Sequence, residues 1–379
     1  MYKKFNFPYL LLSLVPVGYI IKGTLPFDLT LVVYILLYIS ALKRIIIERE
    51  SLYFQRVDLI FCYWVFILFI GTLYSPMQML GFFKATKFLF LGISLIYFLR
   101  LFIKSKEDFE KIIMYFLITS VLTGYLVLID FLLSGSGVNN YRAFGVVVPI
   151  PLSMLGATTT MTTLFLIYYK KIKLFLFLFA IIPSFSMMTL AGSKGPVISL
   201  IVTMILLSPV FLKRIRLKLI FFVLIGIYGL LQINFVKSSL DHLLSRFEKV
   251  GEDMSTISRL SIYKNTLDSF FDKPIFGLGT SSITPYPHNL FLEVLAENGL
   301  TLFVALIVLV SLMLIKYLKY LSKSSKSCFE GLSISLLLIS FISLMFSFTY
   351  VDHKYLFLSI GLLMTYKKVT YFSSTKKEH

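Results

Sequence analysis

Long apolar segments recur along the whole chain and are separated by short stretches that contain lysine and arginine. Apolar runs of about 20 residues are long enough to cross the hydrocarbon core of a bilayer as α-helices. A β-barrel would instead show alternating segments of roughly ten residues, and the sequence lacks them. The pattern therefore predicts twelve membrane-spanning helices, at residues 8–22, 25–42, 57–75, 81–100, 111–133, 143–169, 172–190, 195–212, 217–236, 288–316, 328–350 and 354–367.

The composition of the chain indicates the same class of protein. Of its 379 residues, 58% are hydrophobic and only 15% are charged, whereas a soluble domain carries about a quarter charged residues. We therefore expect an all-α polytopic membrane protein. The two cysteines, Cys62 and Cys328, lie inside or beside apolar runs, and they predict neither a disulfide framework nor a thiolate metal site.

The net charge of +18 could indicate a nucleic-acid-binding protein, but the positions of the basic residues argue against it. Alternate connections between the predicted spans contain 25 of the 37 lysines and arginines. These connections are residues 3–4, 43–56, 100–111, 170–173, 213–218, 316–326 and 367–377. Such a bias marks the cytoplasmic side of membrane proteins. It predicts that both termini are cytoplasmic, and it explains the charge without nucleic acid.

One long connection, residues 236–287, interrupts the otherwise short loops and is predicted to lie on the outer, extracytoplasmic side of the membrane. It separates spans 1–9, within residues 1–235, from spans 10–12 and a cytoplasmic tail, within residues 288–379. Apolar residues at helical spacing predict two short amphipathic helices in this connection, near residues 238–250 and 258–271. A connection of this length in a compact bundle is usually functional.

Polar residues interrupt the apolar pattern where the tenth predicted span begins, in the sequence PHNLFLEVLAENGL. Asn289, Glu293 and Glu297 recur every four residues, which places them on one face of a helix. Either this stripe lines a cavity, or Gly299 breaks the helix and the stripe lies outside the bilayer. His288 precedes the stripe, and an imidazole at the membrane edge can act as a general base or donate a hydrogen bond.

Further ionisable residues fall at the predicted outer side, where an uncompensated charge is costly and therefore a functional candidate. They are Lys84, Lys87, Arg142, Lys194, Arg259 and Asp352. Lys194, in the sequence GSKGP, either snorkels to the interface or holds an anion at the N-terminus of the next helix. For Lys84 and Lys87, a snorkelling pair is at least as good an interpretation as a functional role. For Arg142, the two interpretations are equally good.

The sixth predicted span contains Pro149, Pro151 and five threonines between residues 158 and 163. Prolines can open a membrane helix, and threonine hydroxyls can return hydrogen bonds to its backbone. The pattern favours a packed polar seam, and a substrate-facing wall is the alternative.

Taken together, these elements resemble the bacterial O-antigen ligase and O-antigen polymerase superfamily of membrane glycosyltransferases. The resemblance rests on the order of four elements: Ser193-Lys194-Gly195 opening a mid-chain span, Arg259 starting an amphipathic helix, a KPIFGLG turn, and PHNLFLEVLAENGL. The most specific part runs from Arg259 to Gly299. The resemblance implies a GT-C-like architecture of about twelve transmembrane helices with one large extracytoplasmic loop.

This family transfers a glycan from undecaprenyl pyrophosphate to an acceptor hydroxyl outside the cytoplasmic membrane, and the resemblance implies roles for individual residues. His288 matches the key histidine, expected to activate or position the acceptor hydroxyl. Arg259 matches a basic position, expected to neutralise the charge that develops on the pyrophosphate. Lys194 stands where the family usually has arginine, so it keeps the charge but loses the bidentate fork. The expected substrate-binding residues are Lys194, Arg259, Arg142, Asn289 and Asp352.

The resemblance leaves the acceptor open. A polymerase joins lipid-linked repeat units, whereas a ligase transfers the glycan to a lipid A–core sugar. The short segment between Arg259 and His288 favours a polymerase slightly, because it leaves little loop for a bulky acceptor. A polysaccharide flippase is the alternative from another class, although a flippase would not need a His–Asn turn in an external loop.

The expected location is the bacterial inner membrane, with the active site on its outer face. The expected partners are the undecaprenyl-pyrophosphate-linked glycan, the acceptor glycan and the lipid bilayer, with room for a chain-length regulator. The resemblance implies no cofactor and no metal, in line with the absence of a DxD-type motif from the predicted outer segments.

Overall fold

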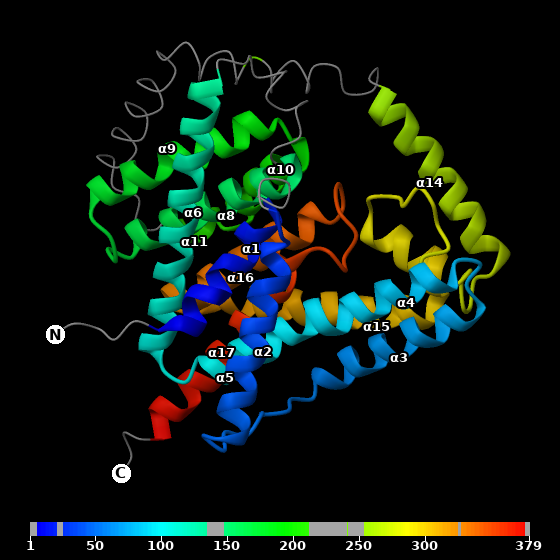
Figure 1. Cartoon of the computed structure of the whole chain (residues 1–379), viewed down its shortest axis with the longest axis horizontal. Coiled ribbons are helices and arrows are strands. Elements are labelled where there is room, and N and C mark those ends of the chain that lie inside the picture. Colours follow the sequence, from blue (N-terminus) through cyan, green and yellow to red (C-terminus); the bar gives the residue numbers. More distant parts are fainter. Residues whose placement is uncertain are drawn as a thin grey trace.

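The computed structural model describes residues 6–20, 26–134, 148–211, 241, 254–324 and 327–375. Over these residues it is entirely helical, without strands (Figure 1). The helices are α1 (Phe7–Ile20), α2 (Leu29–Ile46), α3 (Asp58–Tyr74), α4 (Gln78–Lys87), the π-helix η1 (Phe88–Ile93), α5 (Ser94–Phe102), α6 (Lys106–Ser134), α8 (Pro149–Tyr168), α9 (Leu174–Ala191), α10 (Lys194–Leu206), α11 (Ser208–Phe211), α14 (Met254–Asp272), α15 (Leu290–Ser322), α16 (Cys328–Ser343) and α17 (Lys354–Thr375).

The helices confirm a polytopic α-helical membrane protein. Six are long and apolar enough to cross a membrane, namely α2, the continuous run Gln78–Phe102, α6, α8, α9 and α15. Five shorter apolar helices accompany them within the described residues. The ninth predicted span, residues 217–236, lies outside the described residues, as do Arg142 and nearly all of the first amphipathic helix. The count of twelve spans and the GT-C-like architecture therefore remain predictions.

Helix α8 packs most extensively against α9 and also contacts α10, α16 and α6. Thr158, Thr159, Thr162 and Thr163 are fully buried, and each hydroxyl donates to the carbonyl four residues earlier. This confirms the packed polar seam. The two prolines lie in the first turn of α8, where a missing amide proton costs nothing, so they begin the helix and do not open it.

A buried ion pair anchors the end of the α4–α5 run. Arg100 donates to both carboxylate oxygens of Asp58, at 2.7 and 2.8 Å, and the two side chains are 1% and 0% exposed. The Arg100 guanidinium also lies 5.1 Å from the ring centre of Tyr97. This pair ties the start of α3 to the end of α5. α1 begins and α17 ends on the side of the molecule away from α14 (Figure 1).

Candidate active site

Helix α15 is broken at Gly299, which has φ 61° and ψ −158°. Only glycine adopts this backbone region readily, because a Cβ atom would collide with the neighbouring peptide groups. The break was one of the two arrangements that the sequence left open. It separates a short helix, residues 290–298, from the longer apolar part of α15. The polar stripe therefore lies on a separate short segment.

The loop before α15 lies against this break and forms hydrogen bonds with the free backbone groups at both helix ends. The amides of Leu278 and Gly279 donate to the carbonyls of Ala296 and Glu297, at 2.9 and 2.8 Å. In return, the amide of Leu300 donates to the Pro274 carbonyl at 2.9 Å. A helix end in an apolar environment needs such partners for its free backbone groups. The loop and the broken helix are thus one unit.

Two glycines allow the two backbones to approach this closely. A Cβ atom on Gly277 would overlap the Glu297 carbonyl, and one on Gly299 would overlap the carbonyl of Ile275. Gly277 also has a positive φ of 70°. The glycines Gly277 in KPIFGLG and Gly299 in ENGL therefore serve the same purpose, which is to allow the close contact between the loop and the helix break.

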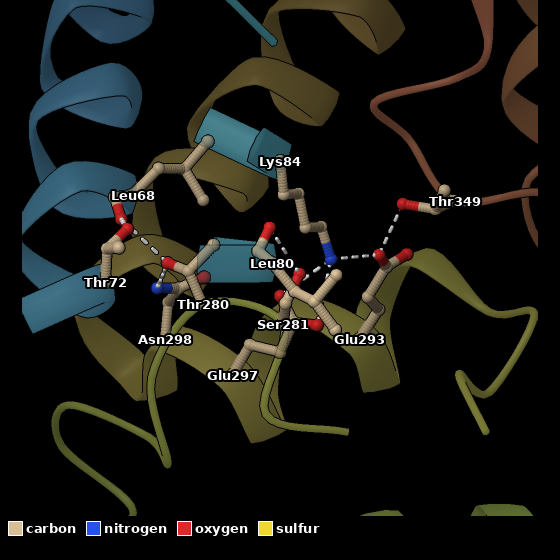
Figure 2. A network of polar contacts seen from close by, with 10 residues as sticks. All are labelled: Leu68, Thr72, Leu80, Lys84, Thr280, Ser281, Glu293, Glu297, Asn298 and Thr349. Atoms are coloured by element: carbon tan, nitrogen blue, oxygen red, sulfur yellow. Dashed lines mark hydrogen bonds and ion pairs between the residues drawn. The ribbon is translucent and has the colours of Figure 1, made fainter. Parts of the chain in front are cut away.

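Both carboxylates of the stripe bind one lysine of α4 (Figure 2). The Lys84 ammonium donates to Glu293 Oε1 at 2.5 Å and to the two oxygens of Glu297 at 2.7 and 2.8 Å. The side chains of Lys84, Glu293 and Glu297 are 11%, 0% and 2% exposed. Lys84 is therefore not a snorkelling residue, because burial with two carboxylates holds its ammonium inside the protein.

His288 lies between this loop and α15 in a left-handed conformation, with φ 51°. Its ring is half-buried, 4.2 Å from the ring centre of Tyr286, and its buried Nδ1 has no hydrogen-bond partner among the described residues. Burial lowers the pKa of His288, and the positive charge of Arg259 lowers it further. The imidazole is therefore neutral at pH 7 and can accept a proton.

Arg259 reaches this region from α14. Burial raises the pKa of Tyr286, and the charges of Glu293 and Asp352 raise it further. Arg259 opposes this rise, as it also lowers the pKa of His288. Charges shift a pKa in this way only at short range. His288, Tyr286 and Arg259 therefore share one electrostatic environment, with Asp352 and Glu293 at its edge.

The segment after α16, residues 344–353, joins the remaining parts of the site. The Leu344 carbonyl accepts from the amide of Leu290 at 3.1 Å, and the Met345 carbonyl accepts from the Asn289 amide group at 3.4 Å. Asp352 belongs to the same segment and forms an ion pair with Lys87 of α4 at 3.7 Å.

Asn289 caps α15. Its side-chain oxygen accepts hydrogen bonds from the amides of Phe291 and Leu292, at 3.1 and 3.2 Å. Asparagine is among the preferred residues for this position because it satisfies the first free amides of a helix. The structure thus gives Asn289 a local role in placing His288, next to its predicted role in binding substrate.

Lys194 is the first residue of α10, two residues after the left-handed Gly192 that ends α9. Gly195 packs so tightly against Ser347 that a Cβ atom on the glycine would lie 2.8 Å from the serine hydroxyl. The GSKGP sequence therefore opens a helix, as predicted, and that helix starts beside segment 344–353. This segment contacts both the Lys194 turn and the turn of His288 and Asn289.

Residues 179–307 match the family model described as O-antigen ligase. This part of the chain is therefore similar to that family. The match supports the superfamily identified from the sequence and, at the family level, a membrane enzyme that transfers glycans. No curated protein and no solved structure matches the chain significantly.

The O-antigen ligase match includes Lys194, Arg259 and His288, whereas Lys84 and segment 344–353 lie outside it. The structure brings His288 and Arg259 into one electrostatic environment and the Lys194 turn next to segment 344–353. Arg142 lies outside the described residues. Among those residues, no three His, Cys, Asp or Glu side chains gather to hold a metal ion.

Sequence reasoning missed the partnership of Lys84 with the two glutamates, and it missed Tyr286. The signal for the Lys84 partnership was that Lys84, Glu293 and Glu297 all fall at the predicted outer side, where a charge without a partner is costly. Tyr286 lies two residues before His288 in a proline-rich turn, and it carries no signal by itself.

Proposed function

We propose that this protein transfers a glycan from undecaprenyl pyrophosphate to the hydroxyl of an acceptor sugar, at the outer face of the inner membrane. The observation that carries the proposal is His288, whose buried Nδ1 has no partner among the described residues and whose imidazole is kept neutral beside Arg259. A neutral imidazole next to a fixed cation suits a reaction that removes a proton and releases an anion.

In the proposed reaction, the acceptor oxygen attacks the anomeric carbon of the donor glycan while His288 takes the hydroxyl proton. The bond between that carbon and the phosphate oxygen breaks, and its electron pair leaves with undecaprenyl pyrophosphate. Arg259 and Lys194 stabilise the charge that develops on the leaving group. The imidazolium then returns its proton to solvent. Arg142, Asn289 and Asp352 are proposed as further contacts to the substrate.

The geometry supports a polymerase, in which the acceptor is a second lipid-linked repeat unit. Residues 274–279 form backbone hydrogen bonds with the helix break. The residues before them, up to Asp272, belong to α14. This arrangement leaves little chain between Arg259 and His288 to recognise a lipid A–core acceptor. The ligase function remains the second candidate, because the matching family model carries that description. The proposed reaction uses no metal ion or other cofactor, and a chain-length regulator is a proposed optional partner.

The test is the glycan produced by a deletion strain that carries wild-type protein or the His288→Ala variant. For a polymerase, we expect the deletion to remove long chains while one repeat unit is still attached to the lipid A–core. For a ligase, we expect lipid-linked polymer to accumulate unattached. His288→Ala should reproduce the deletion at normal protein level, and near-normal transfer by this variant would contradict the proposed mechanism.

The metal-free part of the proposal has its own test. We expect transfer by purified protein in detergent, measured with lipid-linked donor, to continue at an unchanged rate in excess EDTA. A loss of rate that Mg²⁺ or Mn²⁺ restores would show that a divalent ion takes part in the reaction.

A further inference from the structure

Lys84 is the central contact between three segments that are far apart in the sequence (Figure 2). Its ammonium belongs to α4, and its two carboxylate partners belong to the short helix 290–298. Glu293 Oε1 also accepts from the Thr349 hydroxyl at 2.5 Å, and the Lys84 ammonium lies 5.0 Å from the ring centre of Tyr350. Thr349 and Tyr350 belong to segment 344–353, so one lysine joins all three segments.

The loop before α15 is fastened to the same region. The Thr280 hydroxyl donates to the Leu68 carbonyl at 2.8 Å and accepts from the Asn298 side chain at 3.3 Å. The Ser281 hydroxyl reaches the Leu80 carbonyl of α4 at 3.4 Å. These bonds lie around the Lys84 cluster, which we define as Lys84, Glu293, Glu297 and Thr349. The cluster therefore joins the segments that carry His288 and Asp352.

The charges of the cluster make its geometry specific. Two carboxylates with almost no exposure share one ammonium, and the lysine side chain is 11% exposed. A buried charge without its partner is strongly destabilising, so the carboxylates can take up few other arrangements while Lys84 is present. Because Glu293 is five residues after His288 and Thr349 is three residues before Asp352, fixing the cluster fixes both site residues.

We propose that Lys84 is a positioning residue that sets the location of His288 relative to segment 344–353, although it does not touch substrate. The proposal rests on the glycan-transfer function argued above. A displacement of about 1 Å at a reacting group can lower a rate about 100-fold. Loss of Lys84 should therefore lower kcat while the cations that bind the donor, Arg259 and Lys194, remain in place.

Three variants separate positioning from general stability. Lys84→Met leaves two buried carboxylates without a cation. The triple variant Lys84→Met/Glu293→Gln/Glu297→Gln removes all three charges and should regain the thermal stability that Lys84→Met loses. The matched control is Arg100→Met/Asp58→Asn, which removes the other buried pair. That pair lies 16 residues along the same helical run, or about 24 Å away.

We expect Lys84→Met and the triple variant to lower kcat about 10- to 100-fold, with KM for the lipid-linked donor changed less than about 3-fold. The Arg100 and Asp58 control should keep its kcat per folded molecule. If the triple variant recovers both its melting temperature and its kcat, Lys84 serves stability alone and the proposal is overturned. A large rise in KM with unchanged kcat would overturn it too.

Hydrogen exchange gives a readout that does not depend on activity. In Lys84→Met, we expect faster amide exchange in peptides that cover residues 278–290 and 344–353, and unchanged exchange there in the Arg100 and Asp58 control. If wild-type protein transfers no glycan but this exchange pattern is found, the proposed function fails and the positioning role stands. If the exchange of these peptides is unchanged in Lys84→Met, the positioning role fails regardless of activity.

Discussion

His288 is held in place by its neighbours on both sides along the chain. Its main chain follows Pro287 and precedes the cap residue Asn289, so the backbone position is fixed on both sides. Its Nδ1 is buried without a partner among the described residues, which is costly for a polar atom unless another molecule uses it. The site thus combines a fixed imidazole with the nearby cation of Arg259.

The charge of Arg259 predicts a pH effect. The pKa of His288 lies below its ordinary value of 6.5 because of burial first and Arg259 second. The active neutral form therefore persists well into mildly acidic pH, and the rate should fall only below that lowered pKa. Arg259→Gln removes the opposing charge, so the pKa of His288 should rise and the acid limb of the kcat/KM profile should move to higher pH.

The control for this prediction is Arg259→Lys, which keeps the charge and should keep the acid limb in place. We also expect Arg259→Gln to lower kcat/KM about 100- to 1000-fold, as when one oxyanion-stabilising group is lost. An acid limb that stays at the same pH in Arg259→Gln would mean that the limb does not report His288.

Sequence alone could propose site residues only where their local context is distinctive. The motifs of His288 and Lys194 fall on a turn and on a helix start as expected, whereas Arg259 lies inside α14, which begins at Met254 and not beside Arg259. Lys84 could not be assigned, because its role depends on two glutamates more than 200 residues later. An isolated lysine near the end of a predicted span reads as an interfacial residue until its partners are known.

At the scale of elements, the candidate site depends on the break in α15 and on the loop that fills it. The amides and carbonyls at the break find partners in residues 274–279. In an apolar environment, each unsatisfied group would cost several kcal/mol. The sequence indicated that Gly299 could break the helix, but it could not choose, because the groups that stabilise the break belong to a different segment.

Gly299→Ala tests this element. The Gly299 conformation costs other residues about 1–3 kcal/mol, and a Cβ atom would also meet the Ile275 carbonyl. We therefore expect a lower melting temperature in detergent and a loss of glycan transfer, since the loop that carries His288 must shift. The neighbouring Leu300→Ala, at a position that is 44% exposed, is the control and should change neither property much. Wild-type stability in Gly299→Ala would show that the break is not required.

At the scale of the whole molecule, the structure gathers segments that the sequence assigned to one side of the membrane. The start of α4, the Lys194 turn, the loop before α15 and segment 344–353 are joined by hydrogen bonds or close contacts. The Arg100–Asp58 pair lies at the far end of the α4–α5 run, next to connections rich in lysine and arginine. The distribution of lysine and arginine and the contacts in the structure thus assign the same segments to opposite ends of the molecule.

This division predicts which residues a membrane-impermeant maleimide can reach. In a Cys62→Ser/Cys328→Ser background, Asp272→Cys at the end of α14 should be labelled in intact spheroplasts, because α14 belongs to the predicted outer connection. Lys106→Cys at the start of α6 should be labelled only after the membrane is permeabilised. Both positions are exposed, so access from each side of the membrane is the only difference tested. Labelling of Lys106→Cys from outside, with Asp272→Cys protected, would reverse the topology and place the candidate site in the cytoplasm, where the proposed reaction does not take place.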